Sequence, residues 1–401
     1  MQTTLGKLLK SDGGSIKTGP FGTVLKASEY RRSGVPVVSV GEVGYGTLTI
    51  RDSTPRVPSE IIARLPEFVL ESGDIVFGRK GAVDRSSWVR PDQAGWFLGS
   101  DGIRLRSPST VDSRFLAFQL QTMATRSWLL QNATGSTMLS LSQGVLERLP
   151  LSIPTLSEQQ RISKTLGAME DKILSNERTI TTINKLLENS LSLLLSQSDY
   201  STQPLKNFAE INLATIRPEH GHSIRYIDIA SVGVGTIKYP PPIAWADAPS
   251  RARRAVTEGD ILWSTVRPNR RSHALILSPE ENLVASTGLA VISAKGLAWS
   301  YLYETLKRPG FTQTLESFAE GSAYPAVRPD RMAEAPIPVV SDVQRAQFER
   351  FATRLRTQEF QLQQESKTIS ALSEALLPQL ISGKLSVRVA EKRVADVCSQ
   401  I

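Results

Sequence analysis

Two long segments of the chain carry apolar residues at alternating steps of three and four, which is the spacing of a coiled-coil helix. The apolar positions of the first segment are Ile162, Leu166, Met169, Ile173, Ile180, Ile183 and Leu187. Those of the second segment are Phe348, Phe351, Leu355, Leu362, Ile369 and Leu372. Ser157, followed by Glu158, is typical of a helix N-cap with a capping box, and Pro378 lies near the end of the second segment. The pattern predicts two long helices.

The predicted helices, over residues 157–198 and 341–380, are too long for either to bury its apolar stripe alone. At about 1.5 Å per residue, the first would be about 60 Å long. We expect the two to pack on each other as an antiparallel coiled coil. The alternative is two separate amphipathic helices, each packed on its own domain.

Short apolar runs with β-branched residues and flanking glycines predict strands in the rest of the chain. The runs are 35–43, 74–77 and 102–105 in the first half, and 225–232, 260–263 and 288–292 in the second. Residues 113–130 and 299–318 then carry apolar and aromatic residues at roughly helical spacing. Each half therefore predicts a mixed α/β (α+β) domain.

The two halves resemble each other at a nearly constant offset, which indicates an internal repeat. Gly73-Asp74-Ile75-Val76 returns as Gly259-Asp260-Ile261-Leu262, 186 residues later, and Gly135-Ser136 returns as Gly321-Ser322 at the same offset. Two further matches drift by a few residues, Val43–Thr47 with Val232–Thr236 and Ile153-Pro154 with Ile337-Pro338. We attribute the drift to insertions and deletions in surface loops.

The repeat and the helices together predict the organisation of the chain. Two similar domains are each followed by one helix of an antiparallel pair, which gives an approximate two-fold symmetry. The predicted segments are a first domain at 1–153, a helix at 154–200, a second domain at 201–338, a helix at 339–385 and a tail at 386–401. The tail could be disordered or could act as a strap onto the first domain.

Composition and charge narrow the class of protein. The chain has 47 Lys and Arg against 39 Asp and Glu, a net charge of +8, which favours polyanionic partners such as nucleic acid. Cys398 is the only cysteine, so neither an internal disulfide nor a thiolate zinc site is expected. No apolar run is long enough to span a bilayer and the N-terminus has no leader pattern, so we expect a cytoplasmic protein without a membrane partner.

Three segments resemble the specificity subunits of type I restriction–modification systems. Residues 153–162 (IPTLSEQQRI) are similar to the entry into that family's central helix, and residues 376–385 (LLPQLISGKL) to its distal end. Residues 73–81 (GDIVFGRKG) are similar to a segment of its recognition domain. The second copy departs from the pattern at 341–345 and 263–268.

The resemblance implies a DNA-binding specificity subunit in which each target-recognition domain binds one half of a bipartite double-stranded DNA target. It implies that the helix pair docks two modification (methyltransferase) subunits, and that restriction (endonuclease and translocase) subunits complete the complex. It further implies that S-adenosylmethionine and ATP with magnesium bind those partners, and that this chain carries no cofactor and is not an enzyme.

Candidate DNA contacts are cationic, amide, hydroxyl and aromatic side chains in glycine-rich or polar loops, because such groups bind base edges and phosphates. In the first domain they are Tyr45, Thr47, Arg79, Lys80, Arg85, Ser140 and Gln143. In the second domain they are Lys238, Arg267, Asn269, Arg270, Arg271, Tyr324, Arg328 and Arg331. Each could instead be a solvated surface group.

Several motifs of catalysis are missing from the sequence. There is no phosphate-binding loop for ATP, no adenine-methylase Asn-Pro-Pro-aromatic motif and no spaced acidic-x-Lys nuclease pattern. His220 and His222 alternate, but a turn is a better interpretation than a metal site, so no metal ligand is predicted. Two other functions remain open: a coiled-coil adaptor or scaffold without sequence-specific DNA recognition, and a fused restriction–methylation enzyme.

Overall fold

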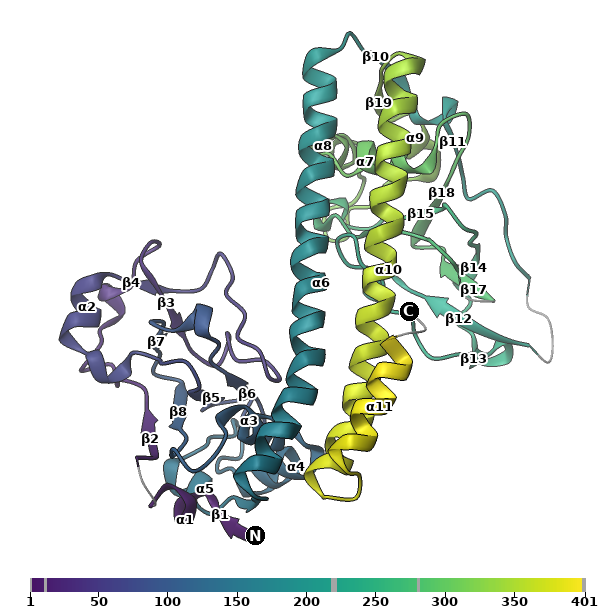
Figure 1. The fold of residues 1–401 in the computed structure, drawn as a ribbon. Helices are drawn as coiled ribbons and strands as arrows, with labels where there is room; N and C mark the ends of the chain where they lie inside the picture. The colour runs from purple at the N-terminus through teal and green to yellow at the C-terminus, as the bar shows by residue number, and fades with distance from the viewer. Residues whose placement is uncertain (1, 11–12, 218–221, 280–281, 399–401) are drawn as a thin grey trace. The chain divides into compact units, whose positions relative to one another are not determined.

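The computed structural model describes residues 2–10, 13–217, 222–279 and 282–398. The chain divides into two compact units: unit 1 is Met1–Leu174 with Glu365–Ile401, and unit 2 is Ser175–Gln364. The two longest helices, α6 (Leu156–Gln197) and α10 (Asp342–Ile381), each contribute one segment to each unit (Figure 1). Each unit therefore combines a mixed α and β domain with part of both helices.

Unit 1 contains a four-stranded antiparallel sheet in the order β2-β8-β5-β6 and a three-stranded sheet in the order β4-β3-β7, with β3 and β7 parallel. Its short first strand pairs with its last, β1 with β9. The strands are β1 (Gln2–Thr4), β2 (Ser15–Thr18), β3 (Val35–Val38), β4 (Arg56–Val57), β5 (Ile75–Gly78), β6 (Ser86–Trp88), β7 (Phe97–Leu98), β8 (Gly102–Arg106) and β9 (Pro150–Ser152). In β5, Ile75 and Phe77 join the core shared with the helices, and Val76 joins the core of the other sheet. This alternation is the two-residue period of a strand.

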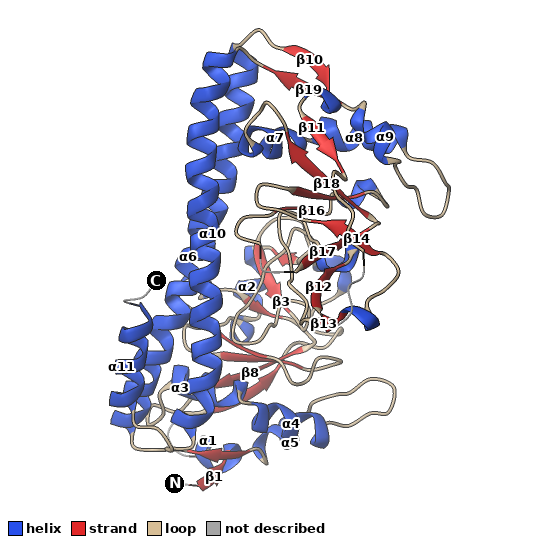
Figure 2. Cartoon of the chain, turned by 90° about the vertical axis from the view of Figure 1, so that its right-hand side faces the viewer, coloured by secondary structure: helices blue, strands red, loops and turns tan. Residues whose placement is uncertain are grey.

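Unit 2 repeats this topology with one additional strand, β14, in its second sheet. One sheet has the order β11-β18-β15-β16, the other β13-β12-β17-β14, with β12 and β17 parallel, and β10 pairs with β19 (Figure 2). The strands are β10 (Ser201–Pro204), β11 (Ala209–Ile211), β12 (Ser223–Ile227), β13 (Ile243–Ala244), β14 (Ala252–Ala255), β15 (Ile261–Ser264), β16 (His273–Leu275), β17 (Leu283–Ser286), β18 (Leu289–Ala294) and β19 (Pro336–Val339). The predicted duplication is confirmed, and the mixed fold class with it.

Three short helices follow the sheets in both units: α3 (Ser113–Gln121), α4 (Met123–Asn132) and α5 (Gln143–Glu147) in unit 1, and α7 (Trp299–Leu306), α8 (Pro309–Phe318) and α9 (Pro329–Ala333) in unit 2. Unit 1 also has α1 (Leu5–Leu9) before β2 and α2 (Ser59–Arg64) between β4 and β5. The helical stretches at 113–130 and 299–318 are each two helices rather than one. Thr122 caps α4 by accepting a hydrogen bond from the Thr125 N–H, and Pro309 begins α8 because proline is well tolerated in the first turn of a helix.

The repeated Gly-Asp pair has the same structural role in both units. Gly73 and Gly259 have φ of 90° and 86°, which favours glycine. The carboxylate of Asp74 accepts a hydrogen bond from the Glu71 N–H at 2.8 Å, and that of Asp260 accepts one from the Thr257 N–H at 2.7 Å. The pair closes the turn that leads into β5 or β15.

The long helices pack on each other in antiparallel orientation within each unit. In unit 1, Lys172 of α6 pairs with Glu365 of α10 at 2.9 Å, and in unit 2 Asn184 donates to Glu359 at 3.0 Å. Buried seam residues are Ile162, Leu166, Met169 and Ile369 in unit 1, and Ile183, Leu187 and Phe348 in unit 2. Partly buried seam residues are Ile173, Ile180, Leu355, Leu362 and Leu372. The predicted antiparallel pair is therefore confirmed.

Two details of the predicted helices were wrong. The N-cap lies at Thr155 rather than Ser157, because the Thr155 hydroxyl already accepts the Glu158 N–H and α6 begins at Leu156. Phe351 is 39% exposed rather than buried in the seam, and the neighbouring Ala352 joins the core of unit 2 instead.

A buried cluster of charges joins α10, α6 and α7 inside unit 2. The Arg356 guanidinium donates to Glu304 at 2.6 Å and to Asn184 at 2.9 Å, and it also pairs with Glu359. Lys307 donates to Glu304 and to Asn184. Burial disfavours the charge on Arg356, but the two carboxylates outweigh burial and raise the pKa of Arg356.

The tail forms helix α11 (Val387–Cys398), which belongs to unit 1. Val387 and Ala390 are buried in the same core as α3 and the adjoining segments of α6 and α10, with Val394 packed against it. Of the two possibilities for the tail, the strap is confirmed for the residues that the structure describes. None of the helices in the described ranges is both long enough and apolar enough to cross a bilayer.

Candidate nucleic-acid interface

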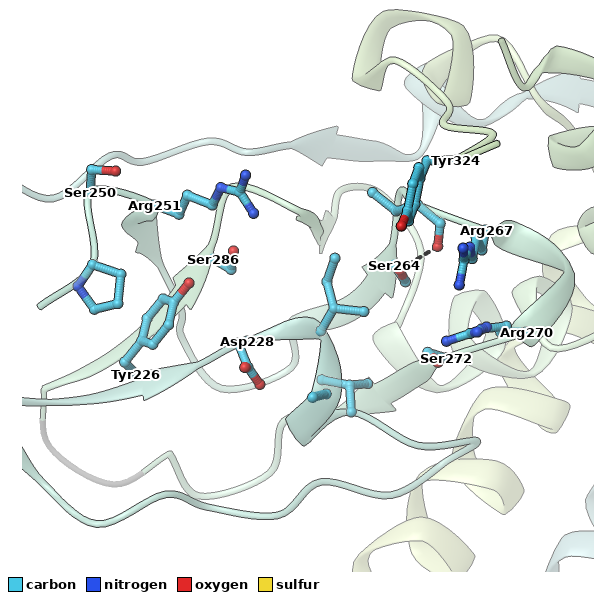
Figure 3. Close-up of a pocket in the computed structure, with 15 residues that line it drawn as sticks. Tyr226, Asp228, Ser250, Arg251, Ser264, Arg267, Arg270, Ser272, Ser286 and Tyr324 are labelled. Atoms are coloured by element: carbon cyan, nitrogen blue, oxygen red, sulfur yellow. Dashed lines mark hydrogen bonds between the residues drawn. The ribbon is translucent and has the colours of Figure 1, made fainter. Parts of the chain in front are cut away.

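Unit 2 contains an open cavity of about 790 Å³ between its second sheet and the loop after β15. Cationic and aromatic groups lie around it (Figure 3). The polar residues that line it are Tyr226, Asp228, Ser250, Arg251, Ser264, Arg267, Arg270, Ser272, Ser286 and Tyr324. Figure 3 shows Arg251 and Tyr226 at one side of the cavity, and Tyr324, Arg267 and Arg270 at the other. This arrangement suits an extended anion with flat, hydrogen-bonding surfaces.

Arg267 is held in an unusual conformation at the edge of this cavity. Its φ of 51° lies in the left-handed region, and its N–H donates to the Pro325 carbonyl at 2.7 Å. The guanidinium carbon lies 4.5 Å from the centre of the Tyr324 ring, which is itself 68% exposed. The arginine is therefore fixed by its backbone and by a cation–π contact, with its hydrogen-bond donors available.

The neighbours of Arg267 differ in what they contact. Asn269 and Arg270 are exposed in the short helical turn Pro268–Arg270. Arg271 turns into the protein, where its guanidinium donates to the Lys307 carbonyl at 2.7 Å. The structure therefore gives Arg271 an anchoring contact within the fold, whereas Asn269 and Arg270 face solvent.

His273 is a buried histidine that was not among the candidates predicted from the sequence. Its ring stacks on Trp263 with centroids 4.6 Å apart, and its Nδ1 lies 2.6 Å from the Arg271 carbonyl oxygen. Burial lowers the pKa of His273 to about 4, so the ring is neutral at pH 7. We infer that it supports the Arg267–Arg271 loop from within the fold.

The remaining candidates of unit 2 lie on its surface. Arg328 is exposed and pairs with Glu320 at 3.3 Å, and Arg331 is exposed on α9. Lys238 is exposed in the loop after β12, where its N–H donates to the Ser231 carbonyl. None of these three lines the cavity.

In unit 1, an exposed aromatic ring lies between two arginines. The Tyr45 ring lies 4.0 Å from the Arg126 guanidinium and 5.6 Å from that of Arg85, and its hydroxyl donates to Asp84 at 2.9 Å. Burial opposes the charge on Asp84, but hydrogen bonds from Arg126 and Tyr45 outweigh it and lower the pKa of Asp84. Thr47 closes the same turn, since its carbonyl accepts from the Gly44 N–H.

The other candidates of unit 1 lie along the loop after β5. Arg79 donates to the Ser100 carbonyl at 3.2 Å and lies over the Phe21 ring, and Lys80 pairs with Asp101 at 3.2 Å. Ser140 forms a bridge to Lys80. Gln143, separately, is exposed at the start of α5 and donates to Thr18 at 3.0 Å.

The same pair of loops meets in both units. In unit 1 the Gly81 N–H donates to the Leu139 carbonyl, and in unit 2 the Arg267 N–H donates to the Pro325 carbonyl. Gly81 and Arg267 occupy matching positions, 186 residues apart, and both have positive φ, 73° and 51°. The duplicated framework therefore presents different side chains at one position.

Some residues of these surfaces were missed from the sequence. Tyr226 and Asp228 line the cavity in unit 2, and Asp84 and Arg126 complete the Tyr45 cluster in unit 1. Arg251, which also lines the cavity, was indicated by the basic run at Arg251, Arg253 and Arg254, whereas the other four carry no local motif. They come together only through strand pairing and helix packing.

Comparison with known proteins gives a match over part of the chain. The model of the type I restriction modification DNA specificity domain matches residues 20–185. These residues are therefore similar to that domain. It is 22% identical over 180 residues to the MjaVIII specificity subunit of Methanocaldococcus jannaschii, and this stretch is 44% of this chain and 42% of that protein.

The fold of the chain is also found in a solved structure. The type I restriction–modification S subunit from M. genitalium matches with a TM-score of 0.60 and 16% identity, over 95% of both chains. The match extends over both repeats. In the described part of the chain, no group of three or more His, Cys, Asp or Glu could hold a metal ion. His222 is exposed there, and His220 lies outside the described residues.

Proposed function

We propose that this chain is the DNA specificity subunit of a type I restriction–modification complex, with each unit binding one half of a bipartite double-stranded target. One observation carries the proposal: both units bring the same pair of loops together on a duplicated framework, and the first loop of each pair is cationic, with Arg79 and Lys80 in unit 1 and Arg267 and Arg270 in unit 2. A split target needs two similar DNA-binding surfaces with different side chains, and the duplication supplies both.

The charges at these loops support DNA as the ligand. The Arg267 guanidinium has an aromatic contact, and among the described residues no carboxylate forms an ion pair with Arg251, Arg267 or Arg270. Unpaired cations next to exposed aromatic rings are suited to phosphates and base edges. The net charge of +8 would favour association with DNA over long distances.

We further propose that the helix pair docks the methyltransferase subunits. Leu186 and Leu193 are seven residues apart on α6 and are 45% and 56% exposed. Exposed apolar residues at heptad spacing suit a helical partner. In this proposal S-adenosylmethionine and ATP with magnesium bind the partner subunits, the restriction subunits complete the complex, and this chain is not catalytic.

Methylation mapping of the host genome tests the proposal. We expect a bipartite motif with methylated adenine that disappears when the gene for this chain is deleted and returns when it is restored. A control strain would carry an unrelated deletion. If the methylated motifs are unchanged by the deletion, the specificity function is wrong and a scaffold role gains support.

A further inference from the structure

We propose that Arg267 recognises a guanine in the half-site bound by unit 2, while Arg270 and Arg251 contact phosphates. This inference rests on the proposed DNA-binding function and assigns roles within one site. It follows from three observations: the backbone of Arg267, the support of its side chain, and the exposure of the other two arginines.

The backbone of Arg267 lies in the left-handed region, which favours glycine and is unfavourable for arginine. Its φ is 51°, and the matching residue of unit 1 is Gly81, with φ of 73°. A residue with a β-carbon costs free energy in this left-handed region, so glycine would be the better choice for folding alone. An arginine at this position therefore indicates that its side chain has a function.

The side chain of Arg267 is oriented in a way that suits base recognition. The exposed Tyr324 ring lies 4.5 Å from the guanidinium carbon, which limits its orientation without using its hydrogen-bond donors. A planar fork held in this way can donate two parallel hydrogen bonds to O6 and N7 of guanine, the commonest specific contact of arginine in the major groove. A phosphate would not need such a fixed geometry.

Arg270 and Arg251 lack comparable support. Both are exposed, and both line the cavity (Figure 3). In the described structure, no aromatic ring lies over either guanidinium. Exposed cations around a binding surface are suited to the phosphate backbone, whose contacts fix the position of the duplex but carry little sequence information.

The test is selection of preferred sequences from a library of random DNA duplexes by the full chain assembled with its methyltransferase subunits. For wild-type protein we expect a guanine at a fixed position of one half-site. Arg267→Ala should reduce the preference for that guanine by about tenfold to a hundredfold and leave the other positions unchanged. Arg267→Lys keeps the charge but not the planar fork, and should lose the same preference.

Arg270→Ala should instead weaken binding to all sequences alike, and should reduce the slope of log affinity against log salt by about 1. Lys295→Ala is a control with the same change of charge, because Lys295 pairs with Glu210 at 2.8 Å and does not line the cavity. Lys295→Ala should change neither the base preference nor the slope of log affinity against log salt.

Three results would overturn the assignment. The first is that Arg267→Ala weakens binding to all DNA sequences alike. The second is that Arg267→Lys keeps the full preference for the guanine. The third is that the lost position is not a guanine–cytosine pair. If Arg267→Ala does not fold, Arg267→Lys decides the question. A wild-type complex that selects no motif at all would refute the proposed function itself, which is a distinguishable outcome.

Discussion

Replacing Arg356 by methionine should strongly destabilise unit 2. The Arg356 side chain is 3% exposed and that of Glu304 is 2% exposed, with 2.6 Å between Nε and Oε1. Without the arginine, Glu359 keeps only its hydrogen bond from Asn184, and Glu304 keeps only Lys307, at 3.3 Å. Removing one partner from a buried pair costs about 3–5 kcal/mol. We expect the lower part of this range, because Lys307 still compensates one carboxylate.

The assay is urea unfolding combined with hydrogen exchange of the α7 and α10 amides, so that the change is located in unit 2. Arg354→Met is the matched control, since Arg354 is exposed two residues away on the same helix and should change stability by less than about 0.5 kcal/mol. Adding Glu304→Gln and Glu359→Gln to Arg356→Met should recover part of the loss by removing the uncompensated charges. A loss below about 1 kcal/mol for Arg356→Met, or an equal loss for Arg354→Met, would refute the reasoning.

Three further predictions follow from the structure. Arg267→Gly should raise the free energy of unfolding, measured by urea titration, by up to about 1 kcal/mol, because glycine adopts a positive φ without strain. The same variant should bind specific DNA more weakly in a gel-shift assay. A clear loss of stability would instead show that the arginine side chain supports the fold. The pKa of His273 is about 4, below its ordinary value of 6.5, so protonation of this ring favours the unfolded chain. Unit 2 should therefore have its full stability above about pH 6.5 and lose about 3 kcal/mol as the pH falls towards 4. Urea unfolding at several pH values checks this, and a His273→Gln variant with the same acid-side loss would contradict it. Ala390→Glu should release α11 from the core and speed the hydrogen exchange of its amides, because Ala390 is fully buried. Val389→Glu, on the exposed side of the helix, should leave the exchange rate unchanged. Equal exchange in the two variants would show that α11 does not depend on this packing.

The parts of the fold that were predicted correctly depend on local spacing. The heptad pattern located both long helices because burial of one helical face is a property of residues three and four apart. The break at Thr122 was missed because a threonine within a helical pattern gives only a weak signal, and it caps a helix only when its own backbone is extended. Sequence spacing thus gives the existence of an element more reliably than its ends.

The candidate site was less accessible to sequence reasoning, since it is made from segments that meet only in the folded chain. Arg267 and Arg270 were found because they form a dense cluster of charge, but their neighbour Arg271 donates to the Lys307 carbonyl inside the fold. Tyr226 and Asp228 belong to the cavity only because β12 lies beside β17. Composition cannot separate a cation that faces solvent from one that anchors a loop.

Under the proposed DNA-binding function, the two units also indicate how the target could change without loss of stability. The turn before β5 and β15 keeps the same glycine and the same aspartate hydrogen bond in both copies, at Asp74 and Asp260. The loop positions Gly81 and Arg267 differ in side chain while their N–H groups keep the same type of contact to the facing loop. Because the framework contacts are made by the backbone at these positions, the side chains there are free to vary with the target. Exchanging the two residues should therefore alter base preference in each unit, with only the small change in stability that a left-handed arginine imposes.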